Sequence, residues 1–212
     1  MRVAVLASGS GSNLQALLDA CRPPEPAEVV LVASNNADAG ALGRARAANV
    51  ATHVIRDAAA GAALLEVFDR HRADLIVLAG YLKLVPADVV RAYHGRMLNL
   101  HPALLPGFGG PGMYGERVHR AVLASGATVT GPTVHLVTTE YDRGPILAQW
   151  PVPVRGDDTA ESLRARVLTA EHQLLPAVVL AAARAGRAVR LTVTGGAFTA
   201  IADATPLSPH LR

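Results

Sequence analysis

Two polar side chains interrupt an apolar stretch of the chain. The stretch Met97–Leu105 reads Met-Leu-Asn-Leu-His-Pro-Ala-Leu-Leu, and Pro106 follows it. Asn99 and His101 are two residues apart, so in a β-strand both side chains leave the same face. An amide can donate a hydrogen bond to a developing oxyanion, and an imidazole can exchange a proton near neutral pH. The pair is a candidate catalytic centre; the alternative is an ordinary buried Asn and His whose partners are structural.

A second candidate site is the glycine-rich segment Ser8–Asn13, here called the first glycine loop. It follows the apolar run Arg2–Ala7 and precedes leucines at helical spacing, so it predicts a turn between a buried strand and a helix. Free backbone N–H groups and the helix dipole at such a helix start favour an anion such as phosphate. The loop lacks the Gly-Lys-Ser/Thr of a P-loop, and no acidic residue follows Val29–Ala33 to bind a dinucleotide ribose. The alternative is a turn that only reverses the chain.

Three further titratable residues lie in the C-terminal half. His135 belongs to an alternating strand pattern, Asp142 to the polar loop that follows it, and Glu171 to a long helical pattern. Glu171 sits beside an apolar stripe, and for it a functional role and a surface position both stay open. A metal site made of His101, His135 and Asp142 is the less favoured interpretation, because these residues lack the helical His-Glu-x-x-His spacing.

The available side chains favour direct acyl transfer over covalent catalysis. Cys21 falls late in the first predicted helix, and no serine occupies the Gly-x-Ser-x-Gly elbow of a hydrolase. In direct transfer an amine attacks a carbonyl, while Asn99 and His101 stabilise the tetrahedral oxyanion. Asp142 would support the protonated imidazole, because a nearby carboxylate raises the pKa of a histidine.

Composition restricts the class of protein. The chain has 212 residues, of which 50% are hydrophobic, so one domain with a substantial core is expected. The formal net charge of +3 comes mostly from scattered arginines, which does not resemble a nucleic-acid-binding stripe. No apolar run approaches the roughly 20 residues of a membrane span, and the start of the chain has no signal-peptide pattern. We therefore expect a soluble cytoplasmic protein that binds neither nucleic acid nor membrane.

The elements that must position these residues alternate between strand and helix in the N-terminal half. Strands are predicted at Arg2–Ala7, Val29–Ala33, Thr52–Ile55, Asp74–Ala79 and from Met97, and helices at Leu14–Cys21, Ala41–Ala48, Ala58–Arg72 and up to Ala92. This order predicts an α/β fold with a Rossmann-like open twisted sheet, parallel in this half and covered by helices on both faces. Ligands bind beyond the carboxyl ends of such strands, where both candidate sites fall.

The C-terminal half predicts antiparallel strands. Predicted in order are a helix at Glu116–Ala124, strands at Ala127–Val137 and Pro145–Val154, a helix capped by Thr159 and reaching about Ala183, and a hairpin of Val189–Val193 and Ala197–Ala202. The segment Gly107–Gly115, here called the second glycine loop, contains five glycines, and we expect it to move as a lid.

Five segments, in order along the chain, resemble the phosphoribosylglycinamide formyltransferase family. They are Ser8–Gln15, Leu78–Tyr81, Asn99–Pro106, Thr133–His135 and Glu171–His172. The resemblance runs from residue 1 to about residue 185. It implies transfer of a formyl group from the co-substrate 10-formyltetrahydrofolate to the amine of glycinamide ribonucleotide, in purine (IMP) biosynthesis and without an acyl-enzyme. It also implies that no metal is used, and it leaves a homodimer open.

The resemblance assigns roles to named residues. Asn99, His101 and Asp142 become the catalytic residues, with His101 as proton donor, Asp142 raising its pKa, and His135 in support. The substrate-binding residues are Gly11, Ser12 and Asn13 for the phosphate and Glu171 for the ribose. The folate-binding residues are Leu82, Lys83, Leu84, Val85, Asn99, Thr138, Thr139 and Asp142.

The resemblance also divides the chain. Residues 1–185 form a single formyltransferase domain, with a phosphate-binding half (1–96) and a formyl-folate and catalytic half (97–185). Beyond the resemblance, the sequence pattern predicts that residues 186–205 form a hairpin packed on it and that residues 206–212 are a flexible tail. Two features depart from the family pattern: the segment after Arg56 is alanine-rich, so no basic residue there is assigned to folate, and the second glycine loop is long and has no lysine.

Other interpretations fit the sequence less well. A methionyl-tRNA formyltransferase would need an additional C-terminal domain and a basic tRNA-binding surface. A formyltetrahydrofolate deformylase would need an N-terminal regulatory domain and water as the acceptor, and sugar-nucleotide formyltransferases should have a different first loop. A non-catalytic phosphate-binding module would retain the first glycine loop, but it would gain nothing from Asn99, His101 and Asp142 occurring together.

Overall fold

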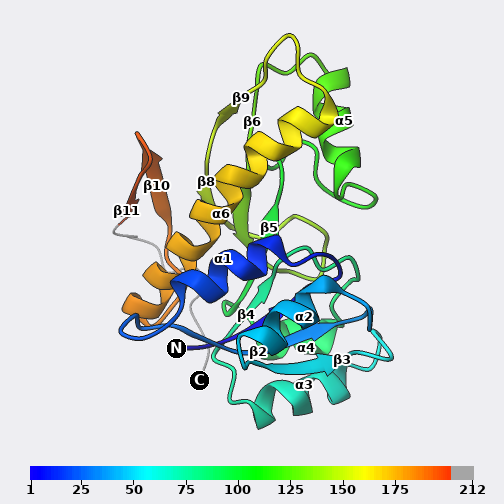
Figure 1. Cartoon of the computed structure of the whole chain (residues 1–212), viewed down its shortest axis with the longest axis vertical. Coiled ribbons are helices and arrows are strands. Elements are labelled where there is room, and N and C mark those ends of the chain that lie inside the picture. The colour runs from blue at the N-terminus through cyan, green and yellow to red at the C-terminus, as the bar shows by residue number, and fades with distance from the viewer. Residues whose placement is uncertain (202–212) are drawn as a thin grey trace.

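A seven-stranded sheet in the order β3-β2-β1-β4-β5-β7-β8 runs through the computed structural model, which describes residues 1–201 (Figure 1). Its strands are β1 (Arg2–Leu6), β2 (Glu28–Ser34), β3 (Ala51–Val54), β4 (Leu75–Leu78), β5 (Met97–His101), β7 (Thr133–Leu136) and β8 (Ile146–Gln149). The strands from β3 to β5 pair in parallel, whereas β7 is antiparallel to both β5 and β8. The predicted α/β class, with parallel strands followed by antiparallel ones, is confirmed.

Helices cover both faces of the sheet, as predicted. Helices α1 (Ser12–Ala20), α2 (Gly40–Ala47) and α6 (Ala160–Ala185) pack into one buried cluster, and α3 (Gly61–Arg70) and α4 (Ala87–Ala92) pack into another. The strand β1 shows why: Val3 and Val5 belong to the first cluster, while Ala4 and Leu6 belong to the second. A strand whose two faces are both covered must be apolar at every position, which explains the continuous apolar run near the N-terminus.

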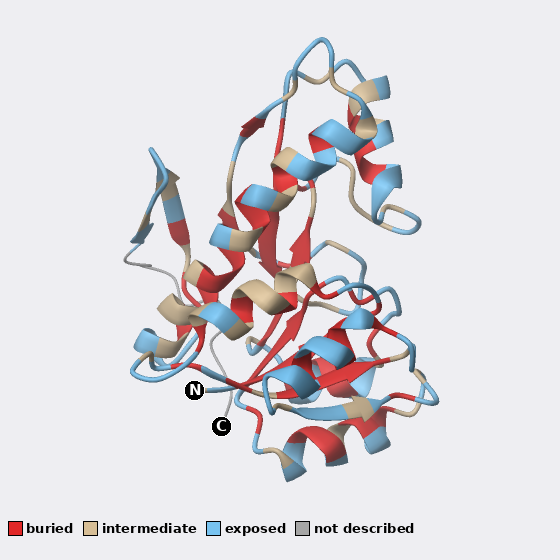
Figure 2. Ribbon diagram, viewed as in Figure 1, coloured by how far each residue is buried: buried red, intermediate tan, exposed pale blue. Residues whose placement is uncertain are grey.

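A smaller lobe extends from the carboxyl side of the sheet, at the top of Figure 1. It contains α5 (Glu116–Ala124), the short strands β6 (Val129–Thr130) and β9 (Val152–Pro153), and the first turns of α6. Its own core consists of Val122, Val152, Leu163, Val167 and Ala170. In Figure 2 the ribbon of this lobe is mostly exposed or intermediate, with a few buried segments among them.

Two predicted strands are wrong in their extent, because each is interrupted. The stretch Ala127–Val137 forms β6 and β7, and Pro145–Val154 forms β8 and β9. Between β6 and β7, Gly131 has φ 138°, and a Cβ there would overlap the carbonyl oxygen of Trp150. The strand β6 therefore lies outside the main sheet and pairs with β9.

The long helix α6 is stabilised at its start by the predicted cap. The Thr159 hydroxyl accepts a hydrogen bond from the Ser162 N–H at 3.2 Å, and the Ser162 hydroxyl accepts one from the Thr159 N–H at 3.0 Å. This reciprocal pair satisfies two backbone donors that the helix itself cannot. At the other end Gly186 adopts a left-handed conformation with φ 68°.

The chain after α6 forms a hairpin of β10 (Leu191–Thr194) and β11 (Ala197–Ala200). Leu191 is buried in the same cluster as α1 and α6, and the Phe198 ring lies 5.5 Å from that of Trp150 in an edge-to-face arrangement. The predicted tail, 206–212, lies outside the described residues, and the proposed division into domains stays a prediction. Within residues 1–201, no helix combines the length and apolar character needed to cross a membrane.

Candidate active site

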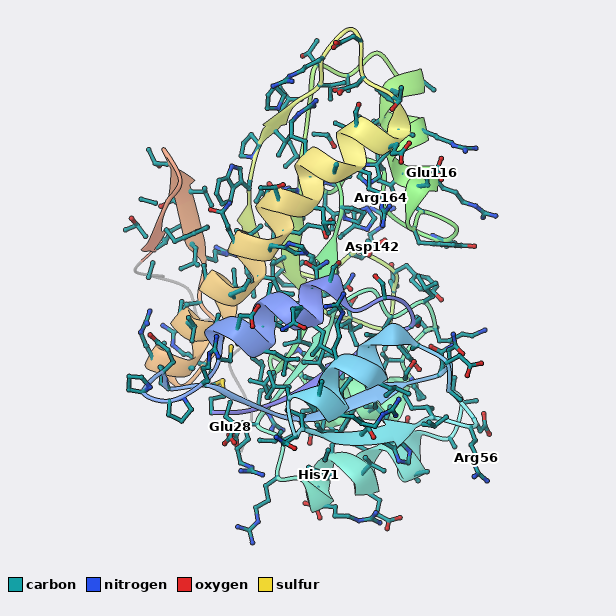
Figure 3. All side chains as sticks on the ribbon, in the orientation of Figure 1. Glu28, Arg56, His71, Glu116, Asp142 and Arg164 are labelled. Carbon is teal, nitrogen blue, oxygen red and sulfur yellow. The ribbon has the colours of Figure 1, made fainter. Side chains whose placement is uncertain are left out.

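The carboxyl ends of β1, β4 and β5 open into one cavity of about 500 Å³. It is lined by the first glycine loop, the segment after β4, the second glycine loop, α5 and α6. Asn99, His101 and Asp142 all line it. Figure 3 shows Asp142 and Arg164 on the same side of α6. Three segments far apart in the sequence therefore border one space, as expected at this edge of a parallel sheet.

The first glycine loop is held tightly against α2. Gly11 has φ 76°, and a Cβ there would come within 2.7 Å of the Cα of Ala41. The Ala41 N–H donates to the Gly9 carbonyl oxygen at 3.1 Å, and Arg44 Nε donates to the Ser10 carbonyl oxygen at 2.9 Å. The helix α1 begins at the end of this loop without a side-chain cap. Its first backbone N–H groups and its dipole suit an anion.

The predicted ribose-binding carboxylate is buried beside this loop. Glu171 is only 7% exposed, so the alternative of a surface carboxylate is wrong. Its Oε2 accepts a hydrogen bond from Asn13 Nδ2 at 2.7 Å. Burial raises the pKa of Glu171, while the Asn13 hydrogen bond and the positive charge of Arg164 oppose that rise. Asn13 Oδ1 is buried with no hydrogen-bond partner in the described part of the chain, so this polar atom is left without a structural role.

The orientation of the Asn99 amide is determined by His135, which lies directly opposite it in the β5–β7 pair. His135 Nδ1 lies 2.8 Å from the Leu136 carbonyl oxygen, which can only accept, so Nδ1 carries the proton. In the neutral ring Nε2 is then an acceptor, and it lies 3.0 Å from Asn99 Nδ2. The nitrogen of the amide therefore faces His135, and its second N–H donates to Asp142 Oδ1 at 3.3 Å.

His101 is buried between Asp142 and the second glycine loop. It is 3% exposed, with Nε2 2.8 Å from the Phe108 carbonyl oxygen and Nδ1 3.6 Å from Asp142 Oδ2. Burial lowers the pKa of His101 below its ordinary value, and His135 adds to this, although Asp142 and the Phe108 carbonyl act in the raising direction. Asp142 raises the pKa of His101, as expected, but desolvation of the ring is the larger effect, so the net direction is downward.

Asp142 is the residue that connects the other two. Its Oδ2 accepts a hydrogen bond from the Gly110 N–H at 2.8 Å, and its Oδ1 lies 3.6 Å from His135 Nε2. Burial raises the pKa of Asp142, but the interactions with His135, Gly110 and His101 outweigh it and lower the pKa below its ordinary value. Asp142 is therefore a carboxylate at neutral pH. It adopts φ 55°, an unusual conformation for a residue with a side chain, which is consistent with its position being determined by these contacts.

The residues predicted to bind folate divide between two spaces. Lys83, Leu84, Val85 and Thr138 line a smaller adjoining cavity of about 50 Å³, together with Asn99 and Asp142. Leu82 lines the larger cavity, and Thr139 lines neither. The Leu82 and Leu84 side chains are 52% and 48% exposed, which is unusual for leucine and leaves apolar surface at the cavity mouth.

Two basic residues of the large cavity were not predicted from the sequence. His119 of α5 is 2% exposed, and its Nδ1 has no hydrogen-bond partner in the described chain. Burial lowers its pKa to about 4, with smaller contributions of the same sign from Arg164 and His101. Arg164 of α6 is the second. The signal for Arg164 was its spacing, since it precedes Glu171 by seven residues and so lies on the same helical face; His119 gives no signal beyond lying among valines.

Comparisons of the sequence and of the structure with known proteins all point to the same family. The family model described as Formyl transferase matches residues 1–179. The chain is 41% identical over 186 residues to phosphoribosylglycinamide formyltransferase of Escherichia coli, covering 84% of this chain and 85% of that protein. The structure is similar to that of phosphoribosylglycinamide formyltransferase from Anaplasma phagocytophilum, with a TM-score of 0.83, 34% identity, and coverage of 97% of this chain and 95% of the other.

A longer relative is matched only in part. The chloroplastic phosphoribosylglycinamide formyltransferase of Arabidopsis thaliana is 44% identical over 186 residues, which are 84% of this chain but 64% of the relative. The chain thus spans less than two thirds of that protein. Within residues 1–201, no group of three or more His, Cys, Asp and Glu side chains is arranged to hold a metal ion.

Proposed function

Because the chain belongs to the phosphoribosylglycinamide formyltransferases of the formyl transferase family, we propose that it transfers a formyl group from 10-formyltetrahydrofolate to the amine of glycinamide ribonucleotide. The products are formylglycinamide ribonucleotide and tetrahydrofolate, in a step of purine biosynthesis. One observation carries the proposal: Asn99, His101 and Asp142 meet on the wall of a cavity that the first glycine loop also lines.

The ribonucleotide occupies the half of the cavity next to α1. Gly11, Ser12 and Asn13 bind its phosphate through backbone N–H groups and the helix dipole. Glu171 binds the ribose: its Oε2 accepts from Asn13, which leaves Oε1 to accept hydrogen bonds from hydroxyl groups. The contact between Asn13 and Glu171 supports this arrangement, because it joins the phosphate side and the ribose side of the substrate in one rigid unit.

The transfer takes place at Asn99 and His101. The amine nitrogen forms a bond to the formyl carbon, the bond from that carbon to N10 of the folate breaks, and one proton passes from the amine to N10. The Asn99 amide stabilises the tetrahedral oxyanion, and the N–H that it releases for this purpose is the one in the longer, 3.3 Å contact with Asp142. His101 passes this proton on: its imidazolium donates to N10, and the imidazole that remains takes up the proton lost by the amine. The Asp142 carboxylate stabilises the imidazolium against the cost of burial.

The folate lies on the opposite side of this pair. Leu82, Lys83, Leu84 and Val85 form one side of its site, and Thr138 and Thr139 belong to the loop on the other. The exposed leucines suit the flat face of a pterin, since covering them removes apolar surface from water. No step of the proposed transfer uses a metal ion.

The test is whether the two substrates depend on each other. Purified protein should release tetrahydrofolate only when 10-formyltetrahydrofolate and glycinamide ribonucleotide are both present, with the formyl group recovered on the ribonucleotide. Release of tetrahydrofolate and formate in the absence of the amine would contradict the proposal and indicate hydrolysis of the formyl donor. Absence of any turnover with both substrates would also contradict it.

A further inference from the structure

The acidic side chains of the large cavity are unfavourable for an anionic substrate unless a cation in the cavity offsets their charge. Asp142 and Glu171 are both acidic, and both line the cavity. Among the described residues that line it, Arg164 is the one arginine or lysine. A phosphate entering beside Glu171 is repelled by that carboxylate wherever Glu171 is ionised, so a nearby cation is needed in addition to the α1 dipole.

Arg164 has the position and the freedom to provide that cation. Arg164, Leu168 and Glu171 are spaced by four and three residues on α6, so they form one stripe, and all three line the cavity. Arg164 makes no hydrogen bond and no ion pair with the residues that the structure describes. By contrast, Arg166 on the adjoining face forms a two-point contact with Asp158 at 2.6 and 2.7 Å. The first turns of α6 thus carry one arginine used for structure and one left unpaired at the cavity.

His119 provides a second, independent sign of a ligand at the same place. It lines the same cavity from α5, which packs against α6, and its side chain is buried with an Nδ1 that has no partner among the described residues. Leaving a buried polar atom without a partner is costly, so such atoms in native proteins call for an explanation such as a missing ligand. Because its pKa is lowered to about 4, His119 is neutral at pH 7 and adds hydrogen-bonding capacity without charge.

We propose that Arg164 binds the phosphate group of the ribonucleotide substrate from the α6 side, facing the backbone N–H groups of the first glycine loop, with His119 adjoining it. This rests on the proposed function for the identity of the ribonucleotide. A guanidinium presents a planar set of N–H donors that fits two phosphate oxygens at once. The stripe then binds the two parts of a ribose phosphate through opposite charges. The carboxylate of Glu171 accepts hydrogen bonds from the hydroxyl groups, and the Arg164 guanidinium donates hydrogen bonds to the phosphate.

The alternative anion is a carboxylate of the folate substrate, and the geometry disfavours it. The residues proposed for the pterin, from Lys83 to Val85 and Thr138, line the smaller adjoining cavity. Arg164 does not line that cavity, whereas it shares the larger one with the first glycine loop. Lys83, which does line the smaller cavity, is the cation available to the folate side.

The experiment compares Arg164→Gln and Arg164→Lys with a matched control, Arg184→Gln. Arg184 lies on the same helix but pairs with Glu25 at the surface, so its substitution removes the same charge far from the cavity. Calorimetry with ribose 5-phosphate should show affinity falling about tenfold or more in Arg164→Gln, since a hydrogen bond to a charged group is typically of that strength. Arg164→Lys should lose less, because it retains the charge, and Arg184→Gln should match the unaltered protein.

Steady-state kinetics then separate the two substrates. In Arg164→Gln the KM for the ribonucleotide should rise about tenfold, more than kcat falls, while the KM for 10-formyltetrahydrofolate stays the same. A rise in the KM for 10-formyltetrahydrofolate alone would overturn the proposal. So would equal affinities of the unaltered protein and Arg164→Gln for ribose 5-phosphate, or the absence of measurable ribose 5-phosphate binding to both proteins. If the protein binds ribose 5-phosphate through Arg164 yet formylates nothing, the proposed function fails and the phosphate contact stands.

Discussion

The two glycine loops border the same cavity, but their glycines are needed for different physical reasons. In the first loop, a Cβ on Gly11 would meet the Cα of Ala41 at 2.7 Å, so the backbone of α2 forbids a side chain. In the second loop, Gly110 and Gly112 have φ 97° and 84° with nothing within 4 Å of a Cβ. Packing against α2 therefore requires a glycine at position 11, whereas at positions 110 and 112 only the backbone conformation favours one.

This difference shows that glycine content by itself does not distinguish a rigid cradle from a segment able to move. The second loop contacts the cavity residues through its backbone, with the Phe108 carbonyl oxygen on His101 and the Gly110 N–H on Asp142. His101 Nε2 donates to that carbonyl, so it can reach a substrate only after Phe108 moves away. We therefore expect the first loop to bind without rearrangement and the second to move during turnover.

The largest expected effect comes from Asp142→Asn, because Asp142 connects the second loop to His101. Removing the carboxylate charge takes away the interaction that opposes burial of the imidazolium. The kcat should fall at least about a hundredfold, the scale typical of acid–base and oxyanion groups, and His101→Ala should lose a similar amount. Calorimetric affinity for ribose 5-phosphate should be unchanged, since the first loop is untouched. A kcat within tenfold of the unaltered protein in both variants would contradict the assigned chemistry.

The comparison of the loops predicts a larger loss of stability in Gly11→Ala than in Gly112→Ala. Both glycines have positive φ, but only Gly11 is confined by Ala41. Gly11→Ala should lower the free energy of unfolding by about 2 kcal/mol or more, because overpacking adds to backbone strain. The affinity for ribose 5-phosphate should also fall at least about tenfold. Gly112→Ala should cost only about 1 kcal/mol, from strain alone, and leave binding unchanged. Urea unfolding and calorimetry measure both; equal costs in the two variants would show that packing does not shape the first loop.

A smaller effect is expected where the second loop does have a close neighbour. A Cβ on Gly109 would press on Leu105 and lie 3.1 Å from the Cβ of Asp142. Gly109→Ala should therefore displace Asp142 slightly and reduce kcat about tenfold, since small misplacements of catalytic groups are costly. Gly107→Ala is the matched control, because the nearest atom to its Cβ is the Leu104 carbonyl oxygen at 3.3 Å. Equal kcat values for the two variants would show that Asp142 tolerates displacement.

Features that depend on neighbouring residues could be predicted from the sequence, and features that depend on residues far apart in the chain could not. The apolar residues of β4, such as Ile76 and Val77, are buried on both faces of the sheet, so local composition was enough to identify the strand. Asn99 and His101 were found from their spacing of two. The break at Gly131 was missed because it depends on the carbonyl of Trp150, nineteen residues away in sequence, and on the pairing of β6 with β9.

The same reasoning explains what the sequence could not provide at the candidate site. Asp142 lies in a loop with no periodic pattern, and its approach to His101 depends on the hydrogen bond from Gly110 in another loop. The net pKa of His101 depends on burial, which no spacing in the sequence reveals. His119 was overlooked because a histidine on an apolar helix face is usually part of the core; only its unpartnered Nδ1 at the cavity distinguishes it.

The smallest expected effect concerns α5, which begins where the second glycine loop ends. The pKa of His119 is lowered to about 4 in the folded protein, whereas in the unfolded chain it should be near 6.5. The unfolded state then binds a proton that the folded state excludes, so stability falls as the pH drops from about 6.5 towards about 4. Between pH 7.5 and 5.5 this histidine should account for about 1 kcal/mol of lost stability. In His119→Leu the loss on acidification, measured by urea unfolding at both pH values, should be smaller by that amount; an equal loss would mean that burial of His119 does not exclude the proton.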